Sequence, residues 1–240
     1  MRRFALAAVS LVATCAAATA ADLSRPPVIQ APQPYAGWSG FYLGLNVGGA
    51  IGNGRSDFSV GGVTFATVNN SLPGAIGGGQ AGYNWQTGMT VFGVETDFQA
   101  ANLKGTLTAP CAFVCGLPLT ATYSQKVPWF GTVRGRVGAA ASGWLIYATA
   151  GYAYARLETD AFAAAGPASA TISLRDTRSG WTAGGGIEVA LMPGWSAKLE
   201  YLYLDLGRHS TTLAFVGVPA ILDDAHLTMN LVRAGVNYRF

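Results

Sequence analysis

Hydrophobic residues alternate with small or polar residues along most of the chain after residue 37. A period of two is typical of β-strands, because successive side chains point to opposite faces of a sheet. Beyond the N-terminus, no apolar run approaches the ~20 residues that a membrane helix needs. The alternation predicts eight strands, at about residues 38–50, 75–86, 89–101, 126–139, 144–156, 178–191, 195–207 and 227–240.

Short and long connections follow one another in turn between these strands. The short ones are tight turns near residues 86–88, 140–143 and 192–194. The long ones cover about residues 51–74, 102–125, 157–177 and 208–226. Transmembrane barrels have short periplasmic turns and longer extracellular loops, whereas a soluble β-sandwich needs no such regularity. We therefore predict an all-β fold, an eight-stranded antiparallel transmembrane β-barrel with short periplasmic turns and four long extracellular loops.

The two faces of each predicted strand differ in charge. In residues 89–101, Phe92 and Phe98 share one parity, and Glu95 and Asp97 share the other. The other strands with mid-strand charges separate them from their aromatic residues in the same way. A charge on the lipid face near mid-bilayer costs roughly 2–4 kcal/mol, so the charged faces are expected to point into the barrel. In residues 144–156 either face could point outward.

Aromatic residues gather at both ends of the predicted strands, as expected for rings at the two lipid interfaces. The group at the short-turn ends comprises Trp38, Phe41, Tyr83, Trp85, Trp144, Trp195 and Phe240. The group towards the long connections comprises Trp129, Tyr152, Tyr154, Trp181, Tyr201 and Tyr203.

The inward charges are the candidate functional residues. One set lies on neighbouring strands, with Glu95 and Asp97 beside Arg134 and Arg136. A second set comprises Glu188, Lys198, Glu200 and Arg233. An eight-stranded interior is just wide enough for side chains to fill it, and buried ions must be paired. We expect these groups to form a salt-bridge core that closes the lumen; the alternative is a narrow ion path. Inward glycines would make room for the long side chains or allow strong curvature of the strands (Gly44, Gly48, Gly82, Gly93, Gly184, Gly186 and Gly235).

The N-terminus has the features of a secretory signal peptide. Arg2 and Arg3 precede a short apolar stretch that ends at Ala18, and a small-residue cleavage site follows before Ala21. A membrane anchor, or a lipoprotein signal at Cys15, fits the pattern less well. We expect a signal peptide at residues 1–20, a Pro-rich periplasmic linker at 21–36 and the barrel at 37–240.

The composition and the cysteine positions limit which partners and metal sites the chain is expected to have. Only 11% of residues are charged and the net charge is +3, which argues against a nucleic-acid partner. Cys111 and Cys115, in the second long connection, are expected to form a small disulfide rather than a metal site, because no further ligands lie nearby.

Two histidines flank the last long connection. His209 could form a catalytic cluster with Asp205 and Ser210, and His209 with His226 could bind a metal or haem iron. Both patterns are nonspecific. We expect no enzymatic activity, no cofactor and no resident metal.

Several segments resemble small alphaproteobacterial outer-membrane immunogenic, or porin-like, β-barrel proteins. They are WSGFYLGLNVGGAIG, GYNWQ, VFGVETDFQ, WFGTVRGRVGAA, LIYATAGYAYA, GWTAGGGIEVAL, WSAKLEYLYLDLG and VRAGVNYRF. The resemblance covers residues 37–240 and implies an outer-membrane location, insertion by the barrel-assembly machinery and antigenic surface loops. Tyr238 and the terminal Phe240 resemble the signal that this machinery reads. No haem motif of the family matches.

Together these features predict a structural barrel that supports the envelope and displays surface loops. The alternative is a narrow porin-like channel or a haem- or metal-binding receptor. The expected partners are outer-membrane lipid and lipopolysaccharide, the barrel-assembly machinery, and host or environmental ligands at the loops.

Overall fold

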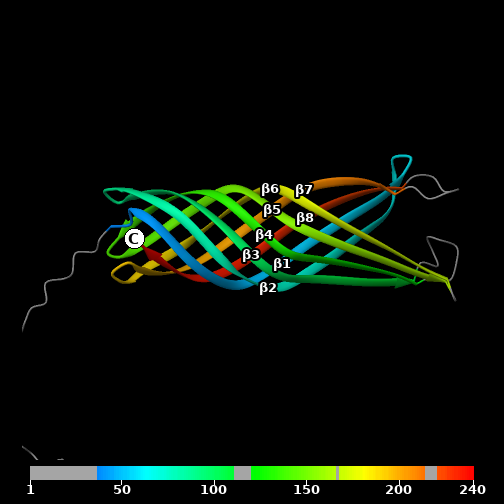
Figure 1. The fold of residues 1–240 in the computed structure, drawn as a ribbon. Helices are drawn as coiled ribbons and strands as arrows, with labels where there is room; N and C mark the ends of the chain where they lie inside the picture. The colour runs from blue at the N-terminus through cyan, green and yellow to red at the C-terminus, as the bar shows by residue number, and fades with distance from the viewer. Residues whose placement is uncertain (1–36, 111–119, 166–167, 214–220) are drawn as a thin grey trace, which may run out of the picture. The chain divides into compact units, whose positions relative to one another are not determined.

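The structure, a computed structural model, describes residues 37–110, 120–165, 168–213 and 221–240. Eight strands form one closed barrel in which each strand pairs with its sequence neighbours (Figure 1). They are β1 (Gly40–Val60), β2 (Val63–Thr87), β3 (Thr90–Pro110), β4 (Thr120–Ala141), β5 (Trp144–Ala165), β6 (Ala168–Met192), β7 (Trp195–Leu213) and β8 (Ile221–Arg239). The expected signal peptide, the linker and the Cys111–Cys115 pair lie outside the described residues.

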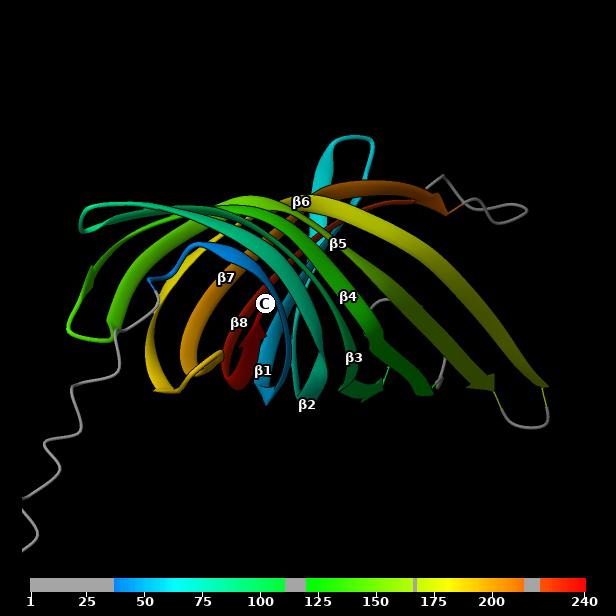
Figure 2. The same ribbon diagram turned by 60° about the vertical axis from the view of Figure 1, so that its left-hand side comes forward.

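The first and last strands close the barrel. β8 runs antiparallel to β1, with Tyr238 opposite Leu43 and Val236 opposite Leu45. Figure 2 shows the red end of the chain beside the blue β1 strand. The prediction of an eight-stranded antiparallel barrel is confirmed. Among the described residues, no helix is long and apolar enough to cross a membrane.

The strands are longer than the alternation predicted. Each has 19–25 residues, roughly twice the ~9–11 that a tilted strand needs to cross a bilayer. The segment 51–74, expected as a loop, is a paired hairpin whose turn is Gly61–Gly62. Both glycines have positive φ, 57° and 83°, as a two-residue hairpin turn requires.

The longer strands correct the expected limits of all four long connections. Pairing continues where the apolar alternation ends, with Arg55 opposite Asn69 and Asp57 opposite Thr67. Beyond the lipid the outward face of a strand contacts water, so nothing selects apolar residues on that face, whereas backbone hydrogen bonding still stabilises the ladder. Hydrophobic periodicity therefore ends before the strands do.

The predicted separation of faces is confirmed. On β1, Leu45 is 69% exposed on the outward face, whereas Tyr42 is 2% exposed in the lumen. The structure also decides the orientation of β5, because Ile146 is exposed while Tyr147 is buried. Its outward face therefore consists of Ile146, Ala148, Ala150 and Tyr152.

Aromatic pairs occur at both ends of the lipid-facing band. Phe41 and Phe240 lie 5.7 Å apart at the short-turn end, and Trp181 and Tyr203 lie 5.5 Å apart towards the far end. Trp38 is an exception and corrects the expected inner group. Its side chain is only 1% exposed, because the residue precedes β1 and enters the lumen.

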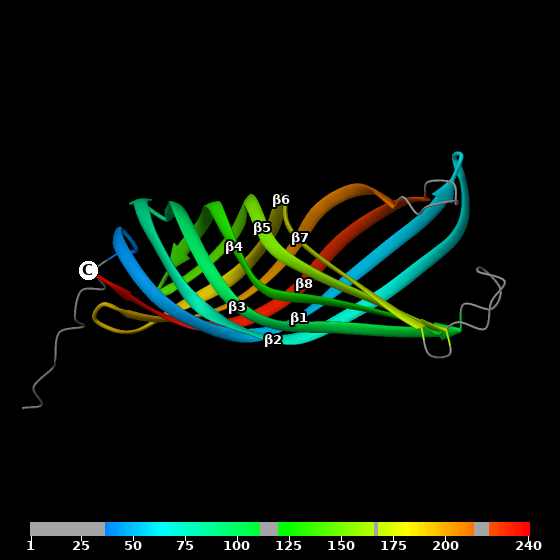
Figure 3. The same cartoon turned by 45° about the vertical axis from the view of Figure 1, so that its right-hand side comes forward.

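The barrel divides into two sheets at the end opposite the short turns. The β2–β3 ladder ends at Ile76 and Ala101, and the β6–β7 ladder ends at Trp181 and Asp205. The other ladders continue further. Two four-stranded sheets therefore extend beyond the closed part, one made of β7, β8, β1 and β2 and the other of β3 to β6; the two groups diverge in Figures 1 and 3.

Candidate functional site

Eight charged side chains meet in the lumen of the closed part of the barrel. Each is at most 5% exposed. They come from five strands and are the residues that the sequence pattern placed on inward faces. They are Glu95 and Asp97 on β3, Arg134 and Arg136 on β4, Glu188 on β6, Lys198 and Glu200 on β7, and Arg233 on β8.

Glu95 is the centre of this network. Its Oε1 atom lies 3.0 Å from Lys198 Nζ and 3.5 Å from Arg233 Nη2. It also forms ion pairs with Arg134 and, at 3.5 Å, with Arg136. The Tyr42 hydroxyl donates a 2.7 Å hydrogen bond to Glu95 Oε2. One carboxylate thus contacts all four lumen cations.

Two arginines join the remaining carboxylates around this centre. Arg134 lies 3.0 Å from Asp97 and 3.1 Å from Glu200. Arg233 lies 3.0 Å from Asp97 and 2.6 Å from Glu200. The Thr132 hydroxyl also donates to Asp97 at 2.6 Å. Bidentate and shared pairing of this kind compensates part of the desolvation of each ion.

Glu188 connects the network to the short-turn end of the barrel. Arg136 Nη2 lies 2.9 Å from Glu188 Oε2. The other oxygen of Glu188 accepts hydrogen bonds from Ser196 at 2.5 Å and from Asn237 at 2.8 Å. Arg136 also lies over the Tyr147 ring, 4.0 Å from its centroid.

The network differs from the two separate sets expected from the sequence. Lys198 pairs with Glu95 and Arg134 pairs with Glu200, so the sets contact each other across the lumen. The reason is the width of the barrel: in an eight-stranded ring, opposite walls are within reach of long side chains. Strand adjacency alone does not reveal such contacts.

Inward glycines make space for the polar side chains, as predicted. A Cβ atom on Gly82 would lie 2.4 Å from the Tyr42 hydroxyl, and one on Gly44 would lie 2.0 Å from Asn237 Oδ1. Both neighbours belong to the hydrogen-bond system around the charges. A larger residue at either glycine would therefore displace a member of the network.

An apolar cluster covers the network at the short-turn end. Trp38 packs there with Val91, Ala140, Leu145 and Tyr147. The Trp38 backbone amide donates to Gln86 Oε1, and the Arg239 guanidinium lies 5.3 Å from the centroid of the Trp38 ring. The segment that precedes β1 thereby closes the periplasmic end of the lumen.

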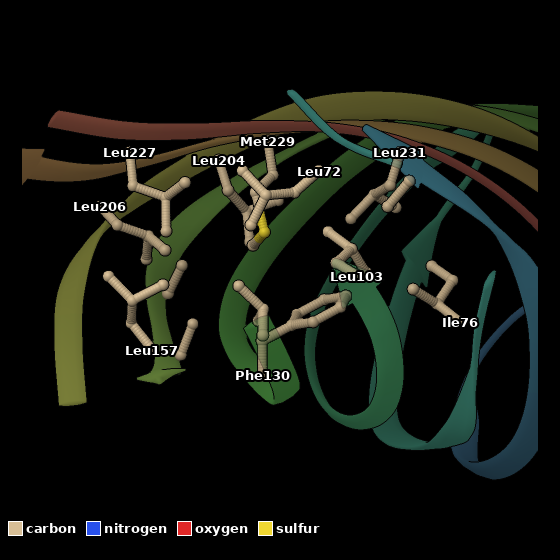
Figure 4. Packing of buried hydrophobic residues seen from close by; sticks show 14 of the residues in the cluster. Leu72, Ile76, Leu103, Phe130, Leu157, Leu204, Leu206, Leu227, Met229 and Leu231 are labelled. Carbon is tan, nitrogen blue, oxygen red and sulfur yellow. The ribbon is translucent and has the colours of Figure 1, made fainter. Parts of the chain in front are cut away.

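A larger apolar cluster fills the lumen on the other side of the charges (Figure 4). It contains Leu72, Leu103, Phe130, Leu157, Leu202, Leu204, Leu206, Leu227, Met229 and Leu231, among others. The sequence interpretation missed this layer. A signal was present, because Leu202, Leu204 and Leu206 continue the inward parity of Lys198 and Glu200.

The charged layer is electrically balanced between these apolar layers. It contains four carboxylates and four cations, all nearly inaccessible to water. An uncompensated ion at this depth would cost several kcal/mol, so each member depends on the others. What the arrangement can do chemically is link five strands through ion pairs and hydrogen bonds.

The histidine clusters considered in the sequence do not assemble as expected. Asp205 pairs with His226, Oδ1 to Nε2 at 2.9 Å, and not with His209. His209 lies 3.7 Å from Asp176, and Ser210 hydrogen-bonds to Asp224. In the described ranges, no group of three or more His, Cys, Asp or Glu side chains is arranged to hold a metal ion.

Tyr238 and Phe240 lie on the outside of the barrel at its closing seam. Phe240 packs on Tyr238 at 5.0 Å and on Phe41 at 5.7 Å, and its amide donates to the Phe41 carbonyl. Both side chains are exposed towards the position of the inner lipid interface.

A family model described as the outer membrane protein beta-barrel domain matches residues 4–240 of the chain. The chain belongs to this family. The 31 kDa outer-membrane immunogenic protein of Brucella melitensis is a relative, 37% identical over the full length of both chains. The 22 kDa outer membrane protein of Rhizobium leguminosarum bv. viciae is 31% identical over 72% of this chain and 66% of its own.

Solved structures agree with this family assignment at the level of the fold. The outer membrane protein OprG of Pseudomonas aeruginosa superposes with a TM-score of 0.53 at 14% sequence identity, over 84% of this chain and 96% of OprG. As a member of the outer-membrane β-barrel family, the protein resides in the bacterial outer membrane, and the family resemblance inferred from its sequence motifs is confirmed.

Proposed function

We propose that this outer-membrane barrel has a structural role: a closed barrel that supports the envelope and displays its extended strands at the cell surface. The observation that carries the proposal is the eight-residue charge network, balanced in sign and buried between two apolar layers. A conducting pore needs a continuous polar path, and the leucine-rich layer interrupts it. The packing therefore favours a plugged barrel over a narrow channel.

The two extended sheets supply the displayed surface. Strands of 19–25 residues continue well beyond the lipid-facing band, and the ladder between β2 and β3 ends at Ile76 and Ala101. Relatives in Brucella are named outer-membrane immunogenic proteins. By that similarity, the sheets beyond the membrane are the antigenic part of this chain, presented by a rigid base.

The proposal includes no catalytic step. Asp205, His209 and Ser210 each interact with a different partner, so these three residues do not form the catalytic cluster considered from the sequence. The partners that follow from the proposal are the barrel-assembly machinery, acting through Tyr238 and Phe240, and ligands of the surface sheets. Pairing of Cys111 with Cys115 remains a prediction for the connection between β3 and β4.

Planar-bilayer conductance of the purified protein tests the plugged lumen. The wild type and the variants Arg134→Ala and Glu95→Gln are compared with Glu158→Gln, which alters an exposed pair with Arg175 at 4.0 Å. We expect no reproducible openings in the wild type or in Glu158→Gln. Regular wild-type openings whose size changes with Arg134 or Glu95, but not with Glu158, would establish a channel and overturn the proposal.

A further inference from the structure

A row of charged side chains crosses the outward face of the β3–β6 sheet. Lys104 on β3 lies directly opposite Lys126 on β4, Lys126 opposite Glu158 on β5, and Glu158 opposite Arg175 on β6. The neighbours of these residues along each strand, such as Leu103, Val127 and Leu157, are buried in the lumen. The charged row therefore points away from the barrel.

Two lysines in direct register are unfavourable by themselves. Like charges directly opposite on one face of a sheet destabilise it, because their Cβ atoms lie only about 5 Å apart. Arg156 adds a third cation on the same face, two residues before Glu158 and therefore diagonal to Lys126. Glu158 lies on the same face, opposite Lys126 and two residues from Arg156, but one carboxylate leaves the three cations with an excess of positive charge.

The nearby carboxylates compensate only part of this positive charge. Lys126 forms an ion pair with Asp160 at 3.8 Å, and Arg175 forms one with Glu158 at 4.0 Å. The side chains of Lys126 and Arg175 are exposed to solvent, so both ion pairs are weak. Across the parts of the chain that the structure describes, no carboxylate lies within ion-pair distance of Lys104 or Arg156. On the other sheet, by contrast, Arg55 is paired with Asp57 at 3.1 Å.

The cluster lies at a defined level of the membrane. Directly below it, Phe98, Trp129 and Tyr154 form an aromatic group on the same three strands, with ring centroids 5.6 Å and 6.2 Å apart. Such a group marks the lipid interface, with headgroups immediately beyond it. Arg156 comes two residues after Tyr154 and Lys126 three residues before Trp129, and Lys104 lies opposite Lys126, so the three cations are expected to face the headgroup layer of the outer leaflet.

A groove on the lipid-facing surface reaches two members of this aromatic group, Phe98 and Tyr154. Its volume is about 510 Å³, and its lining includes Leu43, Leu45, Gly79, Phe98 and Tyr154. Gly79 contributes no side chain, so β2 is recessed between the leucines of β1 and the aromatic group. A groove of this form, ending at aromatic residues below three cations, fits an acyl chain attached to an anionic headgroup.

We propose that Lys104, Lys126 and Arg156 bind the phosphate of a phosphorylated glycolipid of the outer leaflet, with one of its acyl chains in the adjoining groove. The inference adds a lipid-binding site to the barrel and does not depend on whether the lumen conducts. Arginine and lysine together suit a phosphate on a sugar, because one offers a planar pair of donors and the other a point charge.

The test uses purified barrel refolded in detergent micelles without glycolipid. Binding of diphosphoryl lipid A is measured by native mass spectrometry for the wild type and for the triple variant Lys104→Gln/Lys126→Gln/Arg156→Gln. We expect affinity to fall roughly fivefold for each cation removed. The matched control is the double variant Arg55→Gln/Arg208→Gln, compared with Lys104→Gln/Arg156→Gln; its substitutions lie on β1 and β7, away from the charged row, and it should bind like the wild type.

Three further measurements test whether a loss of binding is caused by misfolding, by loss of charge or by loss of the phosphate contact. Heat-modifiable gel migration identifies folded protein, and Lys104→Arg/Lys126→Arg should retain binding because the charges are kept. Lipid A without phosphates should bind no better to the wild type than to the triple glutamine variant. Equal losses in the double variant of the cluster and the double control variant, undiminished binding of dephosphorylated lipid A, or binding of inorganic pyrophosphate as tight as that of lipid A would each overturn the proposal.

Discussion

Lys198 on β7 and Glu95 on β3 are 103 residues apart in the sequence, yet the lysine Nζ lies 3.0 Å from a glutamate oxygen at the centre of the barrel. Both side chains are buried. The contact exists only when the ring of strands is closed, since it joins opposite walls. Charge pairing in the lumen and closure of the barrel therefore stabilise each other.

Substitution Glu200→Gln should destabilise the barrel strongly. Glu200 accepts from Arg134, Arg233 and Tyr147, so loss of its charge leaves two buried arginines undercompensated. Breaking a buried pair typically costs about 3–5 kcal/mol. The midpoint of urea unfolding, followed by heat-modifiable migration in detergent, measures the change. Glu158→Gln is the control, because its 4.0 Å pair is exposed and should be worth less than about 1 kcal/mol. Equal losses in both variants would contradict a special role for the lumen network.

Gly82→Ala should be costly although the change is small. Its Cβ would lie 2.4 Å from the Tyr42 hydroxyl and 2.6 Å from the Val94 carbonyl, so Tyr42 must leave Glu95 or the backbone must shift. Overpacking of this kind costs about 1–3 kcal/mol. Gly79→Ala, on the outward face of the same strand, meets nothing closer than 3.7 Å and serves as control. Denaturation midpoints of the two variants give the comparison; an unchanged Gly82→Ala midpoint would show that the lumen has spare room.

Trp38→Ala should weaken the short-turn end of the barrel. The indole packs with Val91, Leu145 and Tyr147 and is covered by Arg239, so its removal leaves a cavity next to the charged layer. Truncation of a buried tryptophan costs about 3–5 kcal/mol. Trp85→Ala removes a ring of the same size from the lipid-facing side, where the detergent or lipid refills the space, and should cost less. Hydrogen exchange at β3 and β5 amides locates the effect. Equal protection in the two variants would argue that Trp38 does not close the lumen.

Phe240→Ala should reduce the amount of assembled barrel in cells. Phe240 packs on Phe41 and Tyr238 where the last strand meets the first, and its resemblance to a barrel-assembly signal predicts a defect in insertion. Membrane fractionation with heat-modifiable gels measures the folded fraction. Phe92→Ala, which also alters a lipid-exposed phenylalanine but on β3, is the matched control. Normal insertion of Phe240→Ala, or a defect of the same size in Phe92→Ala, would show that Phe240 is not part of a barrel-assembly signal.

Much of the fold could be predicted from the local sequence pattern, because lipid disfavours charged side chains at every outward position of a membrane-spanning strand. A charge on the lipid face is costly wherever it occurs, so parity alone placed Glu95, Arg134 and Lys198 inside. The pattern did not locate the ends of the strands. Beyond Arg55 and Asp57 this restriction ceases, and the hairpin continues through backbone pairing that leaves no hydrophobic signature.

The sequence by itself determined the number of strands, the lipid-facing side of the strands that carry mid-strand charges and the set of charges that enters the lumen, because these follow from side-chain parity along single strands. Only the tertiary structure decided that the charges form one network, that Trp38 enters the lumen instead of the lipid interface, and that leucines fill the space above Arg233. Those outcomes depend on the distance across a closed ring of eight strands. That distance exists only after β8 has paired with β1.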